Sequence, residues 1–207
     1  VPVAAQDLLV SISFLVIIAI ANGMGTIPSA GVGVAEKLCM FIMLVPSSFM
    51  QSLSAFVAQN IGANRNDRAV RAMVCGMLAS LLIGVAMAFL AFFHGDFLSG
   101  LFARDPQVIA ASADYLRAYA VDTLLVSFLF CFSGYFNGCG KTTFVMAQGI
   151  AGAFLVRIPV SFLMSRIQPV SLFLVGLATP CSTVVQILLC AGYFYLLGRK
   201  RRKAGSL

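Results

Sequence analysis

The segment Gly134–Phe144, GYFNGCGKTTF, contains residue types that could bind a phosphate group. A nucleotide-binding P-loop consists of a glycine, four residues and then Gly-Lys-Ser/Thr, so that backbone N–H groups surround the phosphates. Gly140, Lys141 and Thr142 match the end of that motif, but Tyr135 stands where its first glycine belongs. A P-loop also joins a buried strand to a helix, so the interpretation depends on the elements that flank the segment.

Two ionisable residues, Asp122 and Arg157, lie within long apolar segments. A charged side chain at the middle of a membrane helix costs about 2.5–3.5 kcal/mol on insertion scales, and it usually faces a cavity or a partner. Asp122 could face a cavity and bind a cation or a proton, or it could form a fixed ion pair with Arg157 that holds two helices together. A permanent arginine partner would keep Asp122 ionised and make it a poor proton carrier.

Several glutamines also lie in apolar segments. Gln51 and Gln59 are eight residues apart, Gln148 follows the glycine-rich segment, and Gln186 lies near the C-terminal end. Such amides can bind a substrate or bridge two helices through hydrogen bonds. Both roles stay open at this point.

Metal and cofactor chemistry has little support in the sequence. The six cysteines are scattered through apolar segments without a CxxC spacing, and the single histidine, His94, has no second histidine to complete a site. Signatures of intramembrane enzymes, such as H-E-x-x-H or G-x-S-x-G, are absent from the sequence. We therefore expect neither a metal, nor a cofactor, nor an enzymatic activity.

The composition indicates an integral membrane protein. Of the 207 residues, 60% are hydrophobic and 10% are charged, whereas a soluble domain has about 25% charged residues. A helix needs about 20 apolar residues to cross the hydrocarbon core, and six segments are long enough. These are residues 4–25, 36–60, 72–94, 114–136, 143–165 and 170–197. The predicted fold class is an all-α bundle of six transmembrane helices.

This prediction also changes the interpretation of the glycine-rich segment. It becomes a short turn between the fourth and fifth spans, in which Gly138 and Gly140 let the chain reverse. We therefore expect no nucleotide to bind there. Asp122 and Arg157 fall at similar depth, in the outer halves of the two spans that this turn joins.

Basic residues predict the orientation of the bundle. With six spans, both ends lie on one side, and that side has nine basic residues: Arg65, Arg68, Arg71, Lys141, Arg199, Lys200, Arg201, Arg202 and Lys203. The other side has three, Lys37, Arg104 and Arg166, or four when Arg117 is counted with them. The positive-inside rule then predicts cytoplasmic termini in a cell (inner) membrane. Residues 199–207 form a basic tail that suits anionic lipids of the bilayer rather than nucleic acid.

The first residues, VPVAAQDLLV, lead directly into an apolar segment without an initiator methionine or a basic region. This start is not typical of a signal peptide. We expect the chain to be part of a larger membrane protein.

Four stretches of the sequence resemble one transporter family. QSLSAFVAQNIGANRNDRA (Gln51–Ala69), LFARDPQVIAASADYLRAYAVDTLL (Leu101–Leu125), GYFNGCGKT and RIPVSFL are similar, in order and spacing, to segments of the multidrug and toxic compound extrusion (MATE) family. The resemblance implies one six-helix lobe, the C-terminal one, of a twelve-helix transporter. It also implies an N-terminal lobe as partner, small organic cations as substrates, and H⁺ or Na⁺ as the exchanged ion.

One departure from the family concerns its acidic positions. Sodium-coupled members have a carboxylate in the first helix of this lobe and another in the fourth. The corresponding positions are Val10 and Val126 in this sequence, with Asp7 and Asp122 about one turn away. The candidate substrate- or ion-binding residues are therefore Asp122, Arg157, Gln51, Gln59, Asp7 and Gln186. Alternatives to the antiporter are a lipid-linked saccharide flippase of related architecture and a non-transporting membrane scaffold.

Overall fold

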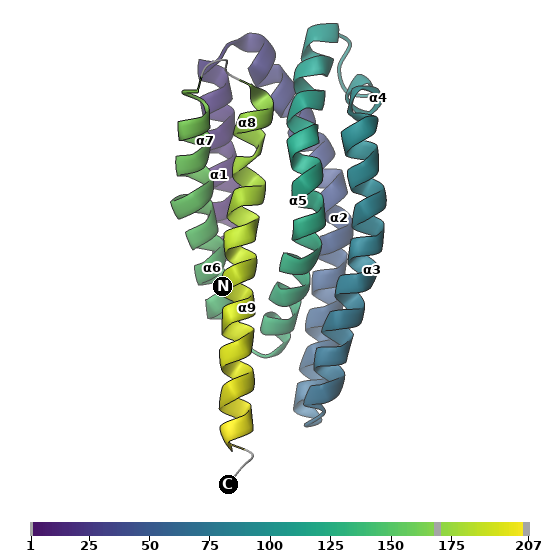
Figure 1. Ribbon diagram of the computed structural model, residues 1–207, viewed down its shortest axis with the longest axis vertical. Coiled ribbons are helices and arrows are strands. Elements are labelled where there is room, and N and C mark those ends of the chain that lie inside the picture. The colour runs from purple at the N-terminus through teal and green to yellow at the C-terminus, as the bar shows by residue number, and fades with distance from the viewer. Residues whose placement is uncertain (1, 168–170, 205–207) are drawn as a thin grey trace.

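The structure is a computed structural model, and it describes residues 2–167 and 171–204. Within these ranges every regular element is helical, as the fold class predicts, and the long helices run roughly along one direction (Figure 1). In chain order the elements are α1 (Pro2–Gly23), α2 (Thr26–Gly62), α3 (Asn66–Phe93), α4 (Gly95–Gly100), α5 (Pro106–Gly138), α6 (Thr142–Ala151), the π-helix η1 (Gly152–Arg157), α7 (Ile158–Met164), α8 (Leu172–Gly176) and α9 (Ala178–Ala204).

Five continuous helical stretches are long and apolar enough to cross a membrane. They are Thr26–Gly62, Asn66–Phe93, Pro106–Gly138, Thr142–Met164 and Leu172–Arg199. Helix α1 adds a shorter apolar stretch, Leu8–Gly23. Large apolar side chains along α3, such as Leu78, Leu82 and Phe93, are exposed, which suits a helix that faces lipid.

Two helices begin well before the predicted spans. Helix α2 starts at Thr26, ten residues before residue 36, and α5 starts at Pro106, eight residues before residue 114. At α5, Oδ1 of Asp105 accepts a hydrogen bond of 2.9 Å from the backbone N–H of Gln107, and Pro106 occupies the first turn. Both are typical of a helix N-terminus. The apolar runs in the sequence mark the membrane core, whereas the helices extend beyond it.

Helix α5 lies at the centre of the bundle, because it contacts α2 and α3 on one side and α8 and α9 on the other (Figure 1). Its buried aromatic residues belong to two apolar clusters. Tyr115 and Tyr119 pack in one cluster with residues of α1, α2 and α8, and Tyr135 and Phe136 pack in the other with residues of α2, α3 and α9. The part of α5 between these clusters contains Asp122.

A close approach of α2 and α5 depends on two glycines of α5. A Cβ at Gly134 would lie 2.6 Å from the carbonyl oxygen of Met50, and one at Gly138 would lie 2.7 Å from that of Ser54. Spacing of four between small residues lets membrane helices approach closely. Gly138 is therefore a packing residue at the end of α5, and the sequence-based assignment of Gly138 to the chain reversal is wrong.

The reversal itself depends on Gly140, whose φ of +71° lies in the left-handed region that glycine adopts without strain. The turn joins helix α5 to helix α6. The P-loop-like residues therefore follow a helix, and the buried strand that a phosphate-binding loop requires is not present before them.

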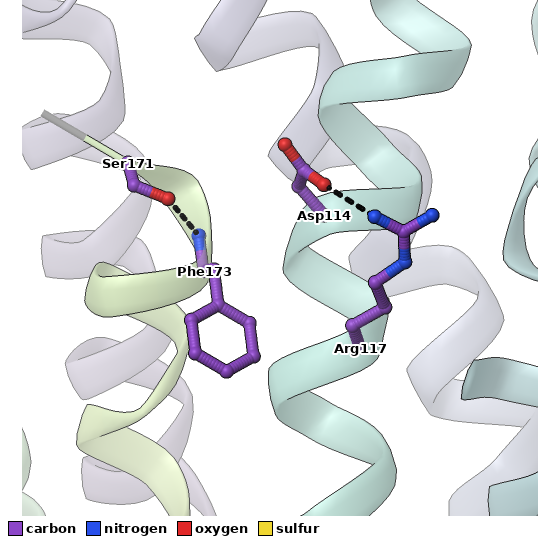
Figure 2. Close-up of polar contacts among 4 residues, drawn as sticks. All are labelled: Asp114, Arg117, Ser171 and Phe173. Atoms are coloured by element: carbon purple, nitrogen blue, oxygen red, sulfur yellow. Dashed lines mark hydrogen bonds and ion pairs between the residues drawn. The ribbon is translucent and has the colours of Figure 1, made fainter.

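At the end of the bundle where α8 begins, polar contacts stabilise two neighbouring elements (Figure 2). The hydroxyl oxygen of Ser171 accepts a hydrogen bond of 3.2 Å from the backbone N–H of Phe173 and so caps α8. On α5, Asp114 and Arg117 form an exposed ion pair of 3.0 Å. It is the one ion pair among residues 8–167 and 171–199, the residues whose side chains the structure describes.

Candidate binding cavity

A cavity of about 210 Å³ lies where α1, α2, α5, α6, η1 and α9 meet. Its charged walls are Asp122 of α5 and Arg157 of η1, and its polar walls include Gln148, Thr183 and Gln186. The remaining lining is mostly apolar: Val10, Phe14, Met43, Met50, Val126, Leu129 and Phe130. A polar cavity of this size has room for several water molecules or a small charged group.

Asp122 occupies the middle of its helix. It lies sixteen positions after Pro106 and sixteen before Gly138. Its side chain is 1% exposed. Oδ1 lies 2.5 Å from the hydroxyl oxygen of Thr183, which donates to it, whereas Oδ2 is buried without a hydrogen-bond partner among the described residues. One carboxylate oxygen therefore has unused hydrogen-bonding capacity.

Arg157 is held at the opposite wall of the cavity by residues of α1. Its Nη1 donates a hydrogen bond of 3.2 Å to the hydroxyl oxygen of Ser13, and the guanidinium carbon lies 4.5 Å from the ring centroid of Phe14. The side chain is 6% exposed, and its buried Nε has no acceptor within the described chain.

Asp122 and Arg157 share the cavity but do not form an ion pair, since the one ion pair of 4.0 Å or less among the side chains of residues 8–167 and 171–199 is Asp114–Arg117. The hypothesis of a fixed structural pair is therefore wrong for this structure. The physical reason is that each of the two side chains contacts residues of a different helix instead. Thr183 of α9 binds Asp122, and Ser13 and Phe14 of α1 hold Arg157.

The π-helix η1 shapes this wall of the cavity. The hydroxyl of Ser182 donates a hydrogen bond of 2.7 Å to the carbonyl oxygen of Gly152, at the start of η1, and Nε2 of Gln186 donates one of 3.0 Å to Ser182. A Cβ at residue 152 would collide with the side chain of Gln186. Segments of π-helix are frequent at functional sites because they shift the register of the following side chains, here that of Arg157.

The predicted site residues divide into three groups. Asp122, Arg157 and Gln186 line the cavity. Gln51 and Gln59 are exposed on α2 and lie outside it. The backbone of Asp7 lies in α1, but its side chain is outside the described part of the structure.

Several polar residues at the cavity were not among the predicted site residues. Thr179 and Thr183 line it, and Ser13 and Ser182 form hydrogen bonds with the lining residues Arg157 and Gln186. Three of them belong to the segment TPCSTVVQ, which continues to Gln186. Its polar residues recur at helical spacing and so share one face of α9. This spacing of polar residues within an apolar span could have identified the polar face of α9 from the sequence.

Glu36 also escaped the sequence-based site, because the predicted second span began at that residue and placed it at the membrane edge beside Lys37. In the structure it lies in the tenth position after Thr26 of α2. It lines a second cavity of about 450 Å³, and this cavity shares Phe14, Met43, Tyr119 and Phe130 with the first. Its Oε1 is buried and has no partner in the described ranges.

The two positions where the resemblance places family acids, Val10 and Val126, both line the smaller cavity. Asp122 lies one helical turn from Val126 on the same helix and lines the same cavity. A carboxylate is therefore present in the expected region although both expected positions are apolar.

Comparisons with known proteins agree with this architecture. The MatE family matches residues 2–163. The probable multidrug resistance protein YoeA of Bacillus subtilis is 24% identical over 202 residues, which cover 98% of this chain and 44% of that protein. An FAD transporter of Shewanella oneidensis is 24% identical over 198 residues, covering 96% of this chain and 43% of that protein. The chain thus spans less than half the length of these two relatives.

Solved structures show the same fold. A MOP superfamily transporter from Pyrococcus furiosus has a TM-score of 0.84 at 20% identity, over 94% of this chain and 43% of that one. A MATE structure in the bent conformation also gives 0.84 at 20% identity, over 92% and 42%. The described helices therefore have the arrangement of about half of such a transporter.

Proposed function

The chain belongs to the MatE family of multi-pass membrane transporters, and from that premise we propose that it is one lobe of a secondary antiporter. The proposed activity is export of organic cations in exchange for H⁺ or Na⁺. The observation that carries this proposal is Asp122, a 1% exposed carboxylate in the middle of a membrane-spanning helix, with one oxygen unpaired at a cavity. Such a carboxylate is costly in a membrane and suits a cation or proton site.

The lining of the two adjoining cavities supports cationic substrates. Phe14, Tyr119 and Phe130 border both cavities, and aromatic faces attract organic cations. Met43 borders both as well, and flexible methionines suit ligands of varied shape. Export of drugs also fits the name of the relative from Bacillus subtilis.

A second lobe of the same transporter is the proposed partner, N-terminal to this one. The chain spans about half the length of its relatives, and Gln51 and Gln59 lie on an exposed surface of α2. We place both termini of the lobe in the cytoplasm of a cell membrane, on the basis of the nine basic residues on that side. No nucleotide, nucleic acid, cofactor or enzymatic step enters this proposal.

The test is efflux by the full-length transporter in proteoliposomes. Tetraphenylphosphonium efflux would be measured under an imposed H⁺ gradient and, separately, an imposed Na⁺ gradient. We expect Asp122→Asn to assemble normally and to lose most efflux, because the amide lacks the charge that attracts a cation.

Asp114→Asn is the matched control. Asp114 lies on the same helix but is exposed and paired with Arg117, so its loss should leave efflux unchanged. If Asp122→Asn transports as fast as the unmodified protein under both gradients, the proposed role of Asp122 is wrong.

A further inference from the structure

Arg157 is a buried cation that this chain leaves uncompensated by direct contact. Its face is covered by the ring of Phe14 at 4.5 Å, which stabilises the charge without neutralising it. Along the edge of the guanidinium, Nη1 donates to Ser13 at 3.2 Å, and Nε has no acceptor in the described ranges. A buried charge without a paired acceptor is costly. Its free edge is therefore a place for an anionic group.

Asp122 is uncompensated in the same way at another wall of the same cavity, since its Oδ2 has no partner within residues 2–167 and 171–204. Oε1 of Gln148, a side chain that is 3% exposed, is also unpartnered there. The cavity thus has one anionic and one cationic group, each oriented by a neighbouring helix and each with unused hydrogen-bonding capacity. Two separate opposite charges suit a ligand that carries both.

We propose that this cavity binds zwitterionic solutes, with the acid group of the solute on Arg157 and its cationic group on Asp122. This inference rests on the proposed transport function and narrows its substrate class. Planar guanidinium groups bind carboxylates through two parallel hydrogen bonds, and the edge of Arg157 that contains the unpartnered Nε fits that mode. A purely cationic solute would interact with Asp122 but would leave Arg157 without an anionic partner.

The lining of the adjoining cavity indicates the chemical character of the rest of the solute. It is larger, about 450 Å³, and it is lined mainly by apolar and aromatic side chains, with four residues shared between the two cavities. Its one acidic residue is Glu36, and it has no basic residue in its lining. An acid group is therefore favoured only beside Arg157, and the apolar body of the solute extends into the larger cavity.

The experiment compares two probes of nearly equal shape on the full-length transporter in lipid nanodiscs, without any ion gradient. One probe is N,N,N-trimethylphenylalanine, a permanent cation with a carboxylate, and the other is its methyl ester, which has the cation alone. The dissociation constants would be measured by equilibrium dialysis. We expect the zwitterion to bind about tenfold or more tightly than the ester, because a hydrogen-bonded charge pair of this kind is worth at least that factor.

The variant Arg157→Gln should abolish this preference, so that the ratio of the two dissociation constants falls to about one or reverses. Arg157→Lys keeps the charge but loses the two-pronged geometry, and we expect an intermediate ratio. Arg166→Gln is the control. Arg166 also lies 4.5 Å over a phenylalanine ring, that of Phe162, but it is exposed and outside both cavities.

A ratio that is the same in the unmodified protein and in Arg157→Gln overturns the proposal. If Arg157→Gln does not fold, the unmodified protein decides alone, and equal or tighter binding of the ester overturns the proposal. The proposed function is tested separately by Asp122→Asn in the efflux assay. A transporter that moves cations but ignores the carboxylate would disprove only the zwitterion site.

Discussion

The hydroxyl of Thr183 lies 2.5 Å from Oδ1 of Asp122, and this hydrogen bond joins α9 to α5 at the buried centre of the bundle. The carbonyl oxygen of Thr179 lies 3.1 Å from the same hydroxyl. Because a hydroxyl has a single hydrogen, it can serve only one of these acceptors at a time. A change at Asp122, such as the arrival of a cation, can therefore turn the hydroxyl towards the backbone of α9.

Removal of that hydroxyl should destabilise the transporter. In Thr183→Val the shape of the side chain is nearly kept, but Asp122 loses the hydroxyl that donates to it. Hydrogen bonds to charged groups contribute about 1.5–3 kcal/mol, so we expect a loss of that size in the free energy of unfolding, measured by SDS titration in mixed micelles. Thr183→Ser, which retains the hydroxyl, is the control. Equal stability of the valine and serine variants would contradict the assigned contact.

The contact between α2 and α5 gives a second prediction. A Cβ at Gly134 would meet the backbone carbonyl oxygen of Met50 at 2.6 Å, and backbone cannot move aside as a flexible side chain can. Gly134→Ala should therefore cost about 1–3 kcal/mol of stability, as overpacked cores do.

Gly192→Ala on α9 is the matched control for that variant, since a Cβ there has nothing within 4 Å. Its effect should be neutral or stabilising by up to about 1 kcal/mol, because alanine favours helix over glycine. The same unfolding titration measures both variants. If Gly134→Ala is as stable as Gly192→Ala, the close approach of the two helices is wrong.

The turn between α5 and α6 gives a third prediction. Lys141 is exposed in this turn, and a helix rather than a strand precedes it. We expect no saturable ATP binding by the full-length transporter in equilibrium dialysis, and unchanged efflux in Lys141→Ala. ATP binding that saturates and then disappears in Lys141→Ala would instead assign a nucleotide site to this turn.

The fold class and part of the cavity could be predicted from the sequence. Both depend on properties of single segments, namely the length of an apolar run and the cost of burying a charged residue within it. Long apolar runs predict membrane helices whatever their neighbours, and a lone Asp122 within such a run indicates a cavity or a partner. The resemblance to the MATE family is confirmed by the match over residues 2–163. It also directed attention to Val10 and Val126, which line the cavity.

What the sequence could not supply depends on where helices end and on how they face one another. Glu36 was overlooked because the start of α2 is set by residues outside the apolar run. The pairing of Asp122 with Arg157 was a reasonable hypothesis from depth alone. The depth of a residue in the membrane does not say, however, towards which neighbour its helix turns the side chain. In the structure Asp122 accepts from Thr183, and Arg157 donates to Ser13.

The separation of Asp122 and Arg157 gives the last prediction. Removal of one member of a buried ion pair costs about 3–5 kcal/mol, whereas apolar replacement of both can be neutral. These two residues are not in contact, and a polar cavity of this size has room for screening water. We therefore expect Asp122→Asn to cost only about 1 kcal/mol of stability, since the amide oxygen can still accept from Thr183.

The double variant Asp122→Asn/Arg157→Leu then completes a cycle. Its loss of stability should differ from the sum of the two single losses by less than about 3 kcal/mol, because residues that share a cavity without direct contact couple more weakly than a buried ion pair. Efflux of tetraphenylphosphonium should stay low in the double variant, since the carboxylate that attracts the cation is still missing. A double variant that is far more stable than the sum predicts, and that exports normally, would show that the two residues form a structural pair and that neither binds substrate.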